Sequence, residues 1–172
     1  LMRVMILSDS HIISKDNLLA LLKHNQVDYY IHCGDIYMSY EKINLNNFYL
    51  AKGNNDFNKN IHEDLFITID NLKFFITHGH HYNVNSNLNY LYKTGINKNA
   101  DIICFGHTHR PYYKVNNKIT MINPGSICYP RGHYKSPTYC IFDTKNRKTT
   151  FYNTNTLLPC DPFDTSYKKE SF

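Results

Sequence analysis

The chain has 172 residues, 42% of them hydrophobic and 19% charged, with a formal charge of +5. This composition is that of a soluble globular protein and excludes a largely disordered one. The length predicts one domain that buries roughly 70% of the surface exposed by its unfolded chain. Lys and Arg are dispersed, with one short basic cluster at Lys168-Lys169, which argues against a dedicated nucleic-acid binder.

The cysteines and the apolar runs indicate the compartment. Five cysteines, at positions 33, 104, 128, 140 and 160, form no CxxC pair, so we expect free thiols in a reducing compartment. No charged segment followed by a long apolar run opens the chain, and no stretch of about 18 apolar residues occurs. We therefore expect a cytoplasmic protein without a membrane span.

In the first half of the chain, short apolar runs end in polar turns. The run 4–7 is followed by Ser-Asp-Ser and predicts a buried strand. Residues 15–24 place three leucines on one face and predict a helix. Further β-rich segments lie at 28–35, 48–56, 65–70 and 72–80, of which the last two predict a hairpin around Asp70-Asn71.

The second half continues with more strands than helices. We expect a second helix at 86–94, a strand in 100–109, a hairpin at 112–125 turning at Asn116-Asn117, and another hairpin at 138–154. The stretch after Leu157 contains two prolines and little periodicity, which predicts a tail that lies on the surface or is disordered. The expected organisation is an α/β domain over residues 1–156 and a tail over 157–172.

Candidate metal ligands follow the predicted strands. They are Asp9, His11, Asp35, Asn54, His78, His107 and His109. Two pairs, Asp9 with His11 and His107 with His109, have i, i+2 spacing, which in an extended chain directs both side chains of a pair to one side. Because open α/β sheets build their sites at the carboxyl ends of strands, we expect one shared site.

The ligand types indicate the ion. Carboxylate, amide and imidazole groups without thiolate suit Mn²⁺, Fe²⁺, Ni²⁺ or Zn²⁺ better than a structural Cys-zinc site. Seven groups exceed the needs of one tetrahedral ion and suffice for two if a carboxylate bridges. Two ions about 3.5–4 Å apart can clamp a phosphate oxygen and lower the pKa of a bound water from about 15.7 to roughly 7.

Each motif alone is a weak signal, but their order is specific. "DSH", "GD", "GNND", "HGH" and "GHTH" occur in that order, each after a β-like run. In this the sequence resembles the calcineurin-like metallophosphoesterases, over roughly residues 2 to 153. It is most similar to their small single-domain phosphodiesterase branch, which includes the YfcE-like enzymes.

The resemblance implies a fold and a division of ligands. The fold is a four-layer α-β-β-α sandwich. Asp9, His11 and His109 would hold one metal, Asn54, His78 and His107 the other, and Asp35 would bridge both. A bridging hydroxide, positioned through Asp35, Asn54 and His78, would attack phosphorus in line. Two divalent ions are thus implied, Mn²⁺ first and Ni²⁺, Fe²⁺ or Zn²⁺ as alternatives.

Several residues next to these motifs have weaker assignments. The resemblance selects His78 over His80 as the ligand, with His80 lining the phosphate pocket or supporting the ligands. His81 is expected on the surface. "NPGS", 123–126, would close a turn in which Ser126 or backbone N–H groups orient ligands. Arg110 and Arg131 are either phosphate contacts or ordinary surface residues.

Asn55 departs from the family pattern, in which His or Cys is common at this position. A neutral amide cannot act as a general acid near pH 7, although Asn55 could donate a hydrogen bond to a phosphoryl oxygen. Losing general-acid help forfeits roughly 10²–10⁴-fold with poor leaving groups and little with good ones. We therefore expect a phosphodiesterase biased to good leaving groups, with His80 and His133 as replacement acids to examine.

Two other functions are compatible with the motifs. The same fold serves as an interaction scaffold in the retromer complex, although seven intact ligand positions favour chemistry. A nuclease is the other alternative, but a short chain without a Lys/Arg stripe favours a small or cyclic phosphodiester. The physiological substrate, the metal in the cell and the oligomeric state, homo-oligomer included, stay open.

Overall fold

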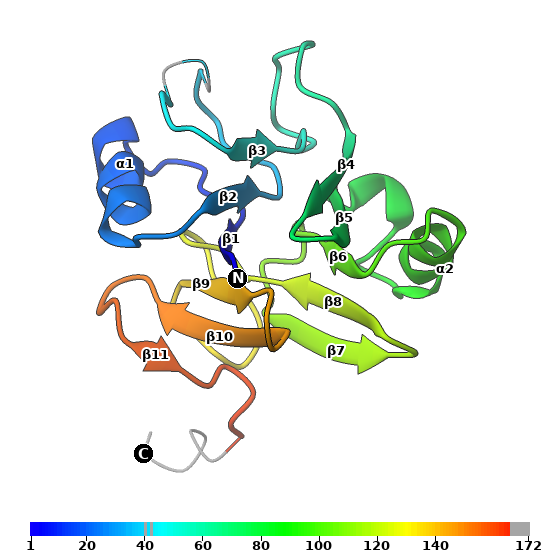
Figure 1. Cartoon of the computed structure of the whole chain (residues 1–172). Coiled ribbons are helices and arrows are strands. Elements are labelled where there is room, and N and C mark those ends of the chain that lie inside the picture. Colours follow the sequence, from blue (N-terminus) through cyan, green and yellow to red (C-terminus); the bar gives the residue numbers. More distant parts are fainter. Residues whose placement is uncertain (40, 42, 166–172) are drawn as a thin grey trace.

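The computed structural model describes residues 1–39, 41 and 43–165, and these residues form two stacked β-sheets (Figure 1). In the described part of the chain, one sheet has six strands in the order β11-β10-β9-β1-β2-β3. Its strands are β1 (Arg3–Leu7), β2 (Tyr29–His32), β3 (Phe48–Leu50), β9 (Thr138–Asp143), β10 (Lys148–Asn153) and β11 (Pro159–Cys160).

The second sheet has five described strands in the order β4-β5-β6-β8-β7. They are β4 (Asp64–Ile69), β5 (Leu72–Thr77), β6 (Ile102–Cys104), β7 (Tyr112–Asn116) and β8 (Ile119–Asn123). In each sheet three neighbouring strands are parallel: β1, β2 and β3 in the first, and β5, β6 and β8 in the second.

The main core lies between the sheets because their strands alternate. On β1, Val4 and Ile6 face the second sheet and pack with its Phe74 and Ile76, whereas Met5 points to the opposite face. Strand β1 is buried on both faces, which explains why its sequence is a continuous apolar run instead of an alternating one.

Helix α1 (Lys15–His24) covers the outer face of the first sheet. Its Leu18, Leu21 and Leu22 are buried beside Met5, as the spacing of the leucines predicts. The helix begins after Ser14, whose hydroxyl accepts a hydrogen bond from the backbone N–H of Asn17 at 3.2 Å.

Helix α2 (Asn89–Asn97) covers the other sheet, which completes the α-β-β-α order of layers (Figure 1). The expected fold class is confirmed. The expected bounds of this helix, 86–94, are wrong by three residues. The Asn-rich segment before it forms local bonds instead: Asn83 has a φ of 52°, and the Asn87 side chain accepts from the N–H of Asn89.

The β4–β5 and β7–β8 hairpins lie where the sequence predicts them, except that one turn is shifted by one residue. Strands β4 and β5 turn at Asp70 and Asn71, both with positive φ, as expected. The turn between β7 and β8 lies at Asn117 and Lys118, one residue later than expected, because Asn116 still pairs with Ile119.

Part of the expected C-terminal tail belongs to the first sheet. Strand β11 pairs with β10, and the Phe163 ring meets that of Phe151 edge-on at 5.2 Å. The rest of that tail, 166–172, lies outside the described residues. Within the described ranges, no helix is both long and apolar enough to cross a membrane.

Candidate metal centre

The seven candidate ligands lie on loops that follow five parallel strands. Asp9 and His11 follow β1, Asp35 follows β2 and Asn54 follows β3 in the first sheet; His78 follows β5, and His107 and His109 follow β6 in the second. Since the carboxyl ends of parallel strands meet at one edge, these loops face one another across the two sheets.

The ligands adopt their positions through left-handed turns. Five of the seven have positive φ: Asp9 (54°), His11 (41°), Asp35 (55°), His107 (67°) and His109 (58°). Positive φ is uncommon in non-glycine residues, and such strained positions cluster at functional sites. The expectation that each i, i+2 pair is extended is therefore wrong, although Asp9 and His11 do share one small volume.

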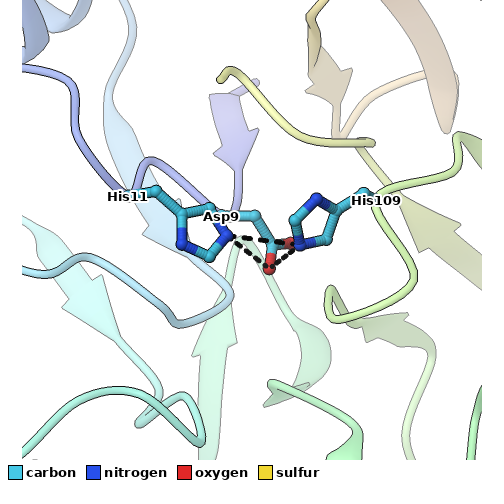
Figure 2. Close-up of side chains that lie close together, drawn as sticks. All are labelled: Asp9, His11 and His109. Carbon is cyan, nitrogen blue, oxygen red and sulfur yellow. Dashed lines mark hydrogen bonds and ion pairs between the residues drawn. The ribbon is translucent and has the colours of Figure 1, made fainter. Parts of the chain in front are cut away.

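Asp9, His11 and His109 form the first close group (Figure 2). The Nε2 atom of His109 lies 3.2 Å from Oδ1 of Asp9 and 3.2 Å from Nε2 of His11. The Nε2 atom of His11 lies 3.9 Å from the same Asp9 oxygen. Asp9 is fully buried, and His11 and His109 are nearly so.

A second group contains Asp35, His78 and Asp9 again. The Nε2 atom of His78 lies 3.6 Å from Oδ2 of Asp35, 3.9 Å from Oδ1 of Asp9 and 3.1 Å from Oδ1 of Asn54. Oδ2 of Asp35 is also 4.0 Å from Nε2 of His11. Asp35 thus lies between the two groups, and Asp9 reaches both.

Hydrogen bonds determine which ring nitrogen carries the proton. Nδ1 of His78 lies 2.7 Å from the carbonyl oxygen of Cys33, and Nδ1 of His109 lies 2.7 Å from that of Tyr129. A carbonyl oxygen only accepts, so each Nδ1 is the donor. In the neutral rings, each Nε2 therefore presents a lone pair to the centre of the site.

The lone pairs of these Nε2 atoms face oxygen atoms that are also hydrogen-bond acceptors. Such a cluster of acceptors is the arrangement that binds a cation. His78 Nε2 faces the oxygens of Asn54 and Asp35, and no described residue donates a hydrogen bond to the buried Oδ1 of Asp9. Buried acceptors are costly unless a donor or a metal ion satisfies them. The carboxylate, amide and imidazole donors therefore fit a divalent ion of the first transition row.

The pKa values of the acidic and imidazole side chains in the site are shifted by burial and by one another. Burial alone would raise the pKa of Asp9, but the neighbouring His109 and His78 imidazoles, in their protonated forms, lower it. Burial opposes protonation of His109, yet Asp9 raises the pKa of that ring. His11 and His107 have lowered pKa values, first because burial disfavours their charged forms.

His107 and His80 lie beside the second group. The ring of His107 meets that of His78 edge-on, with centroids 5.1 Å apart, and its backbone N–H donates to Oδ2 of Asp9 at 3.2 Å. The His80 ring lies 5.4 Å from His78 and 6.1 Å from His107. Burial lowers the pKa of His80 to about 4, so the free ring is neutral at neutral pH.

Asn55 contacts the carboxylate of Asp35. Its backbone N–H donates to Oδ1 at 2.9 Å and its side-chain Nδ2 to Oδ2 at 2.8 Å. The structure therefore gives this unusual residue two hydrogen bonds to the Asp35 carboxylate, an orienting contact that the sequence did not suggest.

The remaining candidates are placed as follows. Ser126 is buried and its hydroxyl donates to the backbone carbonyl of Asp9 at 2.8 Å. Arg110, Arg131 and His133 are exposed. His81 lies on the surface, as expected, with 63% of its side chain accessible.

Asp56 and His32 support the loops and were missed by the sequence analysis. The Asp56 carboxylate accepts four backbone N–H groups, those of Asp35, Ile36, Tyr37 and Gly53. His32 is fully buried. It accepts from the N–H of Gly34 at 3.1 Å, so its Nε2–H faces the hydroxyl of Ser10 at 3.0 Å.

A signal for Asp56 was present in the sequence. "GNND" includes this acidic residue two positions after Asn54, but spacing could not distinguish a ligand from a support. His32 is the last residue of the buried strand β2, where a lone histidine has no sequence signature.

A sandwich with such a donor cluster at its strand ends belongs to the class of metal-dependent hydrolases. A model of the calcineurin-like phosphoesterase superfamily domain matches residues 2–147. The chain belongs to this superfamily, so the expected resemblance and the expected phosphoesterase activity are confirmed at that level.

Relatives agree with this membership. The chain is 35% identical over 155 residues to the probable metallophosphoesterase YsnB of Bacillus subtilis, a match that covers 88% of this chain and 91% of YsnB. It is 34% identical over 172 residues to a phosphodiesterase of Methanocaldococcus jannaschii, covering 86% and 96% of the two chains.

Solved structures have the same fold. A protein from Streptococcus pneumoniae described as a predicted phosphoesterase superposes with a TM-score of 0.78 at 28% identity over 90% of both chains. Zinc-bound Vps29 of Entamoeba histolytica superposes with a TM-score of 0.72 over 88% and 91%; at 21% identity it is similar in fold alone.

Proposed function

We propose that this protein is a phosphodiesterase that uses two divalent metal ions to hydrolyse small phosphodiesters. The observation that carries the proposal is the cluster of acceptors at the strand ends, where Nε2 of His78 faces the Asn54 amide oxygen and the Asp35 carboxylate, and Nε2 of His109 faces the Asp9 carboxylate. The phosphodiesterase activity named for the Methanocaldococcus relative supports the choice of a diester.

Each ion has its own residues in this proposal. Asp9, His11 and His109 hold the first, and Asn54, His78 and His107 hold the second. Asp35 lies between the groups, 4.0 Å from His11 and 3.6 Å from His78, and would bridge the two ions. Oxygen donors beside imidazoles make Mn²⁺ the ion we favour over Ni²⁺, Fe²⁺ and Zn²⁺.

When bound, the ions supply positive charge for the phosphoryl oxygens and lower the pKa of a water nucleophile. The chain keeps the ligands in position. The Cys33 and Tyr129 carbonyls orient two imidazoles through their Nδ1–H groups, and Asn55 orients the Asp35 carboxylate.

The leaving group receives little help in this site. Asn55 has no acidic proton, and the lowered pKa of His80 leaves that ring neutral at pH 7. We therefore propose that the enzyme prefers esters with acidic leaving groups, such as nitrophenyl esters. The loss for alkyl esters would be roughly 10²–10⁴-fold.

Two exposed tyrosines add to this preference. The rings of Tyr37 and Tyr129 lie 5.0 and 5.2 Å from the ring of His11, and 49% and 44% of these residues remain accessible. Such rings offer stacking surfaces for an aromatic ester group beside the first metal.

The test combines metal analysis with turnover. Purified protein loaded with Mn²⁺ should bind two ions per chain and hydrolyse bis(p-nitrophenyl) phosphate, whereas Asp35→Asn should lose metal and activity together. A His62→Ala variant, altered at an exposed residue outside the cluster, serves as the control. Two bound ions without turnover of any mono-, di- or cyclic phosphate would favour the scaffold role instead.

A further inference from the structure

A second cluster of metal-binding side chains lies beside the candidate centre. Glu63 precedes β4, and His80 and His81 open the short 3₁₀ helix η2 (His80–Tyr82) after β5. We propose that these three residues form a separate site for one zinc-class divalent ion, which would be the third ion on this chain.

The β4–β5 hairpin brings the three residues together. Asp64 pairs with Thr77, so the residue before β4 lies beside the residues after β5. Gly79 turns the chain with a φ of 102°, and a Cβ atom there would approach Val84 to 3.0 Å. The hydroxyl of Tyr82 donates to Asp64 at 2.5 Å and ties η2 to the start of β4.

The distances suit a metal ion better than direct hydrogen bonds. Oε2 of Glu63 lies 3.6 Å from Nε2 of His80 and 3.3 Å from Nε2 of His81. An N–H···O bond would be about 2.7–3.2 Å long. Tetrahedral zinc, with bonds of about 2.0–2.2 Å, separates its ligand atoms by roughly 3.3–3.6 Å.

The two rings also lie on the same side of the backbone. The centroids of His80 and His81 are 3.9 Å apart, and the three ligand atoms all lie within 4.8 Å of one another. Consecutive histidines in an extended strand would point to opposite faces. Because the chain forms a 3₁₀ turn after Gly79, both imidazoles can contact the same ion.

The donor set and the local charge define the ligand. Two imidazoles and one carboxylate are a common zinc set with a fourth position open to water. Lys52 lies 3.5 Å from Oε1 of Glu63, so it holds one carboxylate oxygen and leaves Oε2 facing the histidines. The site is open to solvent, since 45% of the Glu63 side chain and 63% of that of His81 are exposed.

This site is distinct from the centre assigned to phosphodiester hydrolysis. It contains none of the seven ligands there, although His80 adjoins His78. The proposal therefore stands whether or not the two-metal phosphodiesterase is correct.

Zinc titration of matched variants tests the site. Wild-type protein, His81→Ala, Glu63→Gln and His62→Ala would be titrated with Zn²⁺ by isothermal calorimetry and equilibrium dialysis. His62 is the control because it is an exposed histidine next to Glu63 that lies outside the cluster. Circular dichroism would confirm that each variant is folded.

We expect His81→Ala to bind one Zn²⁺ fewer than the wild type, because the change removes one of the three proposed ligands. Glu63→Gln should weaken the same binding event, and His62→Ala should leave it unchanged. The comparison measures a difference between variants, so it is valid whatever occupies the main centre. Equal stoichiometry and equal affinities in wild type, His81→Ala and Glu63→Gln would overturn the site.

A crystal soaked in Zn²⁺ provides an independent check. Anomalous scattering should show a peak within about 2.0–2.2 Å of Oε2 of Glu63 and of both Nε2 atoms. A map with peaks at the main centre alone would refute the proposal.

Discussion

Replacing Asp56 by Asn should destabilise the protein strongly. Oδ1 accepts the N–H groups of Ile36 and Tyr37 at 2.9 and 3.1 Å, and Oδ2 accepts those of Asp35 and Gly53, both at 2.8 Å. Asp56 is only 7% exposed. An amide keeps one of these oxygens and turns its NH₂ group towards the two donors that the other oxygen served.

The size of the effect follows from the two lost bonds. A hydrogen bond to a charged group contributes about 1.5–3 kcal/mol, so two of them amount to roughly 3–6 kcal/mol. Domains of this size lose about 2–4 °C of melting temperature per kcal/mol, which predicts a decrease of roughly 6–24 °C. The loops that carry Asp35 and Asn54 would lose their common support, so metal binding should weaken too.

Urea denaturation followed by circular dichroism measures this effect, since the chain has no tryptophan to report by fluorescence. The control is Asp143→Asn. Asp143, the partly exposed last residue of β9, also accepts two backbone N–H groups, at 2.9 and 3.4 Å, but these bonds are open to solvent, so its loss should be below about 1 kcal/mol. If Asp56→Asn unfolded within about 1 kcal/mol of the wild type, the assigned role of this carboxylate would be wrong.

Three further changes test other parts of the structure. Gly53→Ala should weaken metal binding roughly 10–100-fold in a competition titration, because the added Cβ would collide with Asp35; wild-type affinity would contradict the packing. Asn55→His should raise activity on alkyl phosphodiesters relative to nitrophenyl esters if the site lacks an acid, and unchanged relative rates would show that the geometry cannot use one there. Burial raises the pKa of the thiols of Cys33 and Cys140, so the folded state keeps these protons while the unfolded state loses them above about pH 8.5. The free energy of unfolding should therefore fall between pH 8 and pH 10 in urea titrations, and a pH-independent value would argue against buried thiols.

The sequence alone determined the elements whose information is local. The apolar run before Asp9 and the leucine spacing of residues 15–24 predict a buried strand and an amphipathic helix, because each pattern depends on neighbours in the chain. The order of polar motifs at the strand ends likewise predicts the family. These motifs name the donor atoms, whose chemistry does not depend on the fold.

Helix α2 and the β7–β8 turn show where local information is insufficient. Competing side-chain hydrogen bonds among the asparagines before residue 89 delay the start of the helix. Pairing of Asn116 with Ile119 moves the turn by one residue, since cross-strand register decides which residues are left to form it.

Only the tertiary structure decided what surrounds the ligands. The carbonyls of Cys33 and Tyr129, which orient two of the imidazoles, lie 45 and 20 residues away from them in the chain. Glu63 likewise meets His80 and His81 through the β4–β5 pairing. Contacts between distant segments depend on how the sheets stack and on where each loop turns, and no spacing within a single segment encodes them.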